Sequence, residues 1–142
     1  MFQRITSISL IILSLIVLTS NCIGEAKTPV EPQRRYSHIL SMDLNFSISG
    51  GTAHCYGSGR GRDGNATTTV TVTLQRRSSN SSSWSYVDSW SNTQKGTLKV
   101  IVDKDKSVSS GYDYRIRVKC SIKSSSGNIL ESDTMYSKIV SY

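Results

Sequence analysis

The feature that most constrains the fold of this chain is a segment of strict alternation, GYDYRIRVKCSIK, at residues 111–123. Apolar side chains occupy every second position there, and basic side chains fill most of the positions between them. Successive side chains of a β-strand leave opposite faces, so this pattern predicts a half-buried strand. The apolar positions are Tyr114, Ile116, Val118, Cys120 and Ile122. The opposite face holds Arg115, Arg117 and Lys119.

Shorter alternating segments fill the rest of the chain, and no segment indicates a helix. We expect seven strands, at residues 42–48, 52–56, 68–75, 84–90, 98–102, 111–123 and 129–139. The segments between them are expected to be turns or loops: 57–65, 76–83, 92–96, 103–110 and 124–128. This spacing is typical of an all-β, two-sheet antiparallel sandwich.

The glycine-rich segment 57–65, GSGRGRDGN, invites a phosphate-binding interpretation. A phosphate-binding loop needs a lysine and a hydroxyl residue that open a helix, whereas threonines that open a strand follow here. We therefore predict a flexible loop or a bulged strand end.

The first 26 residues predict export. An apolar run from Ile8 to Leu18 is shorter than the about 20 residues that cross a bilayer, and Gly24 and Ala26 suit a signal-peptidase site. We expect a signal peptide at 1–26, an extended leader at 27–40 that carries both prolines, and a domain at 41–142 without a transmembrane segment. A lipoprotein acylated at Cys22 is the alternative.

Two cysteines, Cys55 and Cys120, would remain after cleavage. An even pair in an oxidising compartment predicts a disulfide bond, worth about 4 kcal/mol for so long a loop. Free thiols or a metal pair are the alternatives, but His38 and His54 have no ligand-like spacing to either cysteine. We predict no metal and no cofactor.

Neither histidine lies in a recognisable nucleophile motif, so we expect no enzyme. The net charge of +7 stays the same after cleavage and favours an acidic partner. If Val87 faces the core, alternation turns Trp84, Tyr86 and Trp90 outward, toward the side of Arg115, Arg117 and Lys119. We predict a secreted binding module that contacts an anionic cell-surface glycan or a protein through this face.

Two other interpretations stay open. One is a secreted cationic antagonistic or toxin-like protein. The other is purely structural, with arginine stems covering exposed rings. Nothing in the sequence indicates specific nucleic-acid binding.

The segments LQRRSSNSSSWSYVDSWS and SVSSGYDYRIRVKCSI resemble small secreted proteins of Gram-positive, clostridia-like bacteria. The similarity covers residues 48–142 and implies no catalysis. Cys55, Cys120 and the Tyr114 that opens YRIRV also resemble the inter-sheet bridge and strand start of immunoglobulin and fibronectin type III domains, which implies a sandwich of that kind. The third predicted strand lacks the immunoglobulin tryptophan, and Tyr114 stands six residues before Cys120 instead of two.

Overall fold

The computed structural model describes residues 36–142, and this part of the chain consists of eight β-strands without a helix. The strands are β1 (Ile39–Ser49), β2 (Thr52–Gly61), β3 (Thr67–Arg77), β4 (Ser85–Lys95), β5 (Val100–Ser107), β6 (Asp113–Lys123), β7 (Ile129–Tyr136) and β8 (Val140–Ser141). Residues 36–142 accordingly offer no helical segment that could span a membrane. The expected signal peptide, its cleavage site and most of the expected leader fall within residues 1–35, outside the described part.

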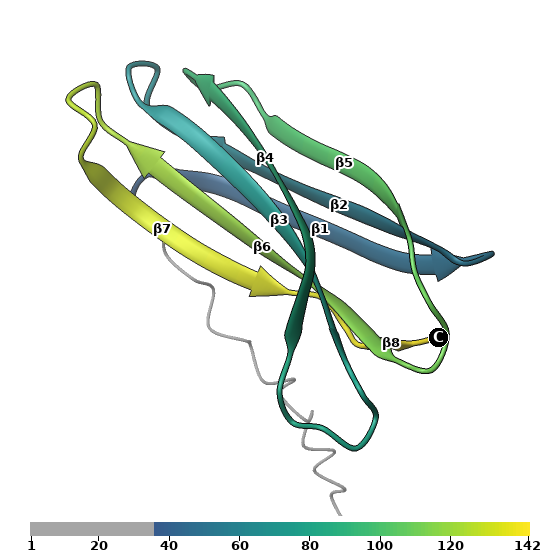
Figure 1. Cartoon of the computed structure of the whole chain (residues 1–142). Coiled ribbons are helices and arrows are strands. Elements are labelled where there is room, and N and C mark those ends of the chain that lie inside the picture. The colour runs from purple at the N-terminus through teal and green to yellow at the C-terminus, as the bar shows by residue number, and fades with distance from the viewer. Residues whose placement is uncertain (1–35) are drawn as a thin grey trace, which may run out of the picture. The chain divides into compact units, whose positions relative to one another are not determined.

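The strands form two antiparallel sheets that face each other (Figure 1). The smaller sheet has the order β1-β2-β5, and the larger has the order β4-β3-β6-β7, with the short β8 paired to β6. This confirms the predicted all-β, two-sheet antiparallel sandwich, and β8 is added to the seven strands that were predicted. Constant-type immunoglobulin domains place the fourth strand in the sheet of the first two. Here β4 pairs with β3 in the other sheet.

The alternation of residues 111–123 correctly predicted β6, the strand at the centre of the core. Its inward side chains are buried against the inward side chains of β3 and β2. Tyr114 is also buried, and its hydroxyl donates to the carbonyl of Ser109, 2.7 Å away. A tyrosine at this place whose hydroxyl bonds a few residues upstream is a feature of immunoglobulin-like sandwiches. It fixes the connection between β5 and β6.

The predicted loop at 57–65 is partly wrong, because β2 continues through the glycines to Gly61. Gly57, Gly59 and Gly61 occupy its inward positions and are buried. A Cβ on Gly57 would lie 2.5 Å from Val72 Cγ2, and one on Gly59 would lie 2.7 Å from Cys120 Sγ. Only residues without a side chain let the two sheets approach this closely.

Two further strands are longer than predicted. β5 runs on through the expected charged connection to Ser107, paired with β2, and β4 runs through an expected turn to Lys95, paired with β3. Both are edge strands of their sheets, so polar side chains reach solvent while the backbone completes the ladder.

The expected last strand, residues 129–139, is interrupted after Tyr136. There the hydroxyl of Ser137 accepts the N–H of Ile116 at 3.0 Å, and the Ser137 N–H donates to the Ile116 carbonyl at 3.0 Å. The serine side chain thus replaces a backbone acceptor of the ladder. The chain then resumes pairing with the start of β6 as β8.

The predicted disulfide bond is absent: Cys55 and Cys120 are free thiols, and both are buried. Cys120 lies opposite Gly59, four residues along β2 from Cys55. At about 3.3 Å per residue the two cysteines are offset by roughly 13 Å, whereas a disulfide needs Cα atoms within about 7 Å. Burial raises the pKa of the Cys55 thiol to about 12 and that of the Cys120 thiol to about 11, so both stay protonated.

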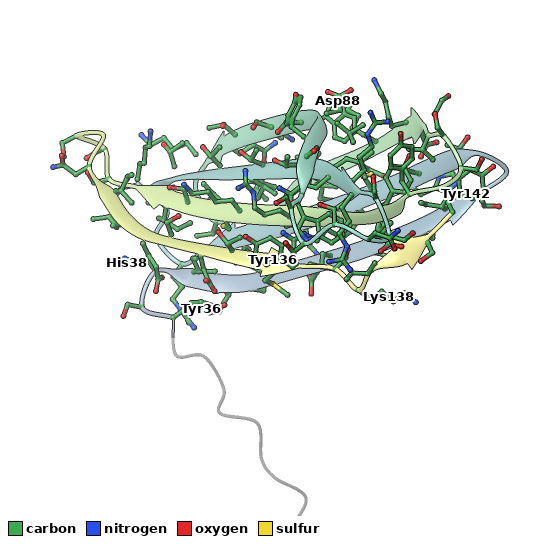
Figure 2. All side chains as sticks on the ribbon, turned by 60° about the horizontal axis from the view of Figure 1, so that its bottom comes forward. Tyr36, His38, Asp88, Tyr136, Lys138 and Tyr142 are labelled. Carbon is green, nitrogen blue, oxygen red and sulfur yellow. The ribbon has the colours of Figure 1, made fainter. Side chains whose placement is uncertain are left out.

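The start of β1 is held by Glu131 on β7. Its carboxylate accepts the backbone N–H groups of Ile39 (2.6 Å), His38 (2.7 Å) and Ser37 (3.2 Å). Burial raises the pKa of Glu131, but these three donors outweigh it and hold the pKa below its usual value. Figure 2 labels Tyr36 and His38 where the described chain begins. This clasp joins an edge of the smaller sheet to an edge of the larger.

Candidate basic face of the larger sheet

The outer surface of the larger sheet collects cations and aromatic rings from four segments. Arg77 comes from β3, Trp84 lies directly before β4, Tyr86 comes from the start of β4, and Tyr136 comes from β7. β6 contributes the three basic positions that alternation predicted. We call this surface the basic face, made of Arg77, Trp84, Tyr86, Arg115, Arg117, Lys119 and Tyr136.

Arg115 is the centre of the basic face. Its guanidinium carbon lies 4.2 Å from the ring centroid of Trp84 and 4.4 Å from that of Tyr136. Its Nε donates to Gln75 Oε1 at 3.0 Å. Arg77 contacts Trp84 as well, with its guanidinium carbon 4.7 Å from that centroid. Each such contact is worth about 0.5–1 kcal/mol at an exposed site, so the guanidinium is held in place before any partner arrives.

Burial of the guanidinium, together with the nearby positive charges of Arg77 and Arg117, lowers the pKa of Arg115. An arginine nevertheless keeps its charge at any physiological pH. The consequence is a cation that is only partly hydrated and has a fixed orientation.

Arg117 and Lys119 continue the row along β6. Arg117 stands in register between Thr73 and Tyr136, and Lys119 stands between Thr71 and Thr134. Within residues 36–142, no carboxylate forms an ion pair with Arg115, Arg117 or Lys119. The described part of the chain therefore leaves these three positive charges without an ion-pair partner.

The hydroxyls of β3 beside this row bond to those of β4. They form the pairs Thr69–Thr93 (2.9 Å), Thr71–Ser91 (2.7 Å) and Thr73–Ser89 (3.1 Å). A rigid polar strip therefore lies beside the basic row.

The acidic residues of the larger sheet point away from the basic face. Asp88, Glu131 and Asp133 pair in register with the core residues Leu74, Ile122 and Cys120, so they occupy inward positions at the sheet edges. Figure 2 shows Asp88 and Tyr136 at opposite edges of this sheet.

One carboxylate, Asp113, does lie at the end of the basic face. It accepts from Ser141 at 2.6 Å and pairs with Arg77 at 3.3 Å. Both interactions lower the pKa of Asp113, and the hydrogen bond from Ser141 has the larger effect. Among residues 36–142, the other cations of the basic face have no ion-pair partner.

Trp90 was expected on the basic face and is not there. It pairs in register with Val72 and packs against the core, as Val87 does. The pairing shifts between Leu74 and Gln75, where Leu74 pairs with Asp88 and Gln75 with Tyr86. Val87 is therefore an extra residue in β4, a β-bulge, and the inward and outward positions are exchanged beyond it. The bulge sends Trp84 and Tyr86 outward and Trp90 inward.

The other expected residues lie where alternation placed them. Tyr86 is 66% exposed and makes no ring contact within residues 36–142, whereas Trp84 is covered by two arginines. Sequence reasoning missed Tyr136 and Arg77, whereas Gln75 lies beside Arg115 as the pairing of the third and sixth strands predicts. The alternation of Thr134 and Tyr136 is visible in the sequence, but only the register of β7 against β6 places that ring beside Arg115.

Within residues 36–142, no three side chains of histidine, cysteine, aspartate and glutamate gather in a way that could hold a metal ion.

Comparisons with known proteins show little likeness. No protein-family model matches the sequence, and no curated protein matches it. Among solved structures, the fold is similar to part of a beta-glucosidase from Kluyveromyces marxianus, at 13% identity over 70% of this chain with a TM-score of 0.40. It is also similar to part of the sporulation control protein Spo0M from Bacillus subtilis, at 10% identity over 71% of this chain with a TM-score of 0.39. The chain spans 14% of the first protein and 49% of the second. Similarities at this level carry no argument about function.

Proposed function

We propose that this protein is an exported, non-enzymatic binding module that contacts an anionic glycan through the basic face. The observation that supports it is the guanidinium of Arg115 held between Trp84 and Tyr136, beside the uncompensated charges of Arg117 and Lys119. Export rests on residues 1–26, which lie outside the described part. An acidic protein is the partner to test if glycans fail.

The geometry favours recognition over simple solvation. A stacked guanidinium has lost its freedom before binding, so less entropy is lost when it bonds a carboxylate or a sulfate. Alternate residues of a strand are about 7 Å apart, so Arg115, Arg117 and Lys119 form a row that an extended acidic chain can follow. The net charge of +7 increases the encounter rate of the whole molecule with polyanions.

Two charge-matched double variants test the proposal. Arg115→Gln with Arg117→Gln removes two charges from the basic face, and Arg62→Gln with Lys104→Gln removes two from exposed positions elsewhere. Binding of each purified protein to immobilised polygalacturonate and dextran sulfate is measured, with neutral dextran as the blank. We expect the first variant to bind at least about tenfold more weakly, and the second to change little.

Salt supplies a second readout. Binding should weaken as the Debye length falls from about 30 Å at 0.01 M to about 8 Å at 0.15 M ionic strength. Circular dichroism and urea unfolding check that both variants fold. An equal loss in the two variants would mean that net charge alone is responsible. No binding to either polyanion at low salt would exclude anionic glycans.

A further inference from the structure

The outer surface of the smaller sheet has a hollow that the basic face does not use. Its volume is about 330 Å³, and its lining residues are Asn45, Ser47, His54, Tyr56 and Asp103. Asn45, Tyr56 and Asp103 are cross-strand neighbours on β1, β2 and β5, and Ser47, His54 and Asp105 form the next row. Three strands therefore bring one aromatic ring and several polar groups to a single depression.

Some side chains around the hollow are already fixed. His54 Nδ1 lies 2.7 Å from Asp105 Oδ1, which sets the orientation of the imidazole ring. On the row beyond Tyr56, Asp43 accepts from Lys99 at 2.9 Å and from Ser58 at 3.3 Å. The two ends of the hollow are thus occupied by satisfied polar groups.

The middle of the hollow is different. Within residues 36–142, the side chains of Asn45, Ser47 and Asp103 form no hydrogen bond with other protein groups. These three side chains are exposed, and between them lies the partly buried ring of Tyr56. A small set of convergent, unpaired polar groups around an apolar surface is the usual composition of a small-ligand site.

The chemistry of these groups restricts the ligand. The carboxylates of Asp103 and Asp105 repel anions, and the described residues hold no cluster that suits a metal ion. A neutral ligand with an apolar face and several hydroxyls satisfies every group: the face covers the ring, and the hydroxyls pair with carboxylate, amide and serine oxygens. Pockets of about 300 Å³ are at the small end of ligand sites, the size of one such ring.

We propose that this hollow is a second binding site, independent of the basic face, that takes a single neutral sugar ring. Tyr56 is its stacking surface, and Asn45, Ser47 and Asp103 bind the sugar hydroxyls. His54, oriented by Asp105, borders the same site.

Nuclear magnetic resonance titration of the ¹⁵N-labelled protein tests the proposal. The probes are glucose, galactose, mannose and N-acetylglucosamine, taken to about 100 mM because shallow sites for one small ring bind in the millimolar range. At least one sugar should give saturable shifts confined to neighbouring positions of β1, β2 and β5. Tyr56→Ala and Asp103→Ala should each weaken that binding at least about fivefold.

Three controls keep the outcome decisive. Arg115→Gln with Arg117→Gln should leave sugar binding unchanged, which separates this site from the basic face. Asn45→Ala supplies a further test should Tyr56→Ala reduce stability. The proposal is overturned if no sugar gives saturable shifts, if the shifts fall on the larger sheet, or if folded Asp103→Ala and Asn45→Ala bind as the parent does.

Discussion

The outer surfaces of the two sheets differ in the sign of the charges that they expose and in the kinds of polar side chain around those charges. The larger sheet exposes stacked arginines and turns most of its carboxylates inward, whereas the smaller sheet exposes Asp43, Asp103 and Asp105 among amides and hydroxyls. Within residues 36–142, the cations of the larger sheet that form no ion pair stand in one row, Arg115, Arg117 and Lys119. Overall charge indicates that an acidic partner is plausible. The strand register indicates which surface would meet it.

The inner surfaces differ just as clearly. β6 fills the interior with large side chains, and β2 opposes them with glycines. The missing side chains of β2 leave the space that the side chains of the larger sheet fill.

The largest effect is expected at Gly57. The Cβ of Gly57→Ala would lie 2.5 Å from Val72 Cγ2 and 2.9 Å from Val118 Cγ2, so the sheets must separate or their valines must shift. We expect a loss of about 3 kcal/mol in the free energy of unfolding, measured in urea. Gly64→Ala is the matched control, because nothing lies within 4 Å of its Cβ. Equal stability of the two variants would contradict close packing at β2.

Trp90 and Trp84 should respond differently to truncation. Trp90→Ala removes a ring that packs against the core and should cost about 2 kcal/mol, less than the about 3–5 kcal/mol of a fully buried ring. Trp84→Ala removes two arginine contacts and should cost about 1 kcal/mol. Urea unfolding of both variants decides. A larger loss for Trp84→Ala than for Trp90→Ala would mean that Trp84, and not Trp90, packs against the core.

Glu131→Gln should weaken the clasp between the sheets in a pH-dependent way. The pKa of Glu131 is lower in the folded protein than in the unfolded chain, so its stabilisation is complete above the unfolded value and is lost as the pH falls through the folded value. We expect a deficit of about 1 kcal/mol at pH 7, since an amide oxygen still accepts the backbone donors. The deficit should shrink at acid pH.

The control for the Glu131→Gln variant is Asp103→Asn, because the carboxylate of Asp103 forms no hydrogen bond within residues 36–142. Thermal unfolding is followed from pH 7 down to pH 3. A Glu131→Gln deficit that stays constant over this range would mean that the charge of Glu131 contributes nothing.

Reducing agent should have no effect on stability. Cys55 and Cys120 share no bond, so the thermal midpoint should be the same with and without dithiothreitol. Mass spectrometry after alkylation in denaturant, without reductant, should find both residues modified. A pair that resists alkylation until it is reduced would require the two sheets to slide by about four residues relative to each other.

Local alternation correctly predicted where seven of the eight strands lie, although not all of their ends, and the outward row of Arg115, Arg117 and Lys119, because alternation depends on neighbours in the sequence. The errors arise where distant segments decide the structure. The offset between Cys55 and Cys120 depends on how the sheets dock, and the inward turn of Trp90 depends on one extra residue beside Val87. Tyr136 reaches Arg115 only through the pairing of β7 with β6.

The two buried thiols can also report how often the strands around them separate. Cys55 lies in the smaller sheet and Cys120 in the larger, and burial keeps both in the unreactive protonated form. A thiol reagent can modify either one only while the surrounding strands are apart, so each modification rate measures how often that sheet opens. If the sandwich opens as a unit, the two rates will be equal. A faster rate at Cys55 would show that the glycine-rich sheet separates first.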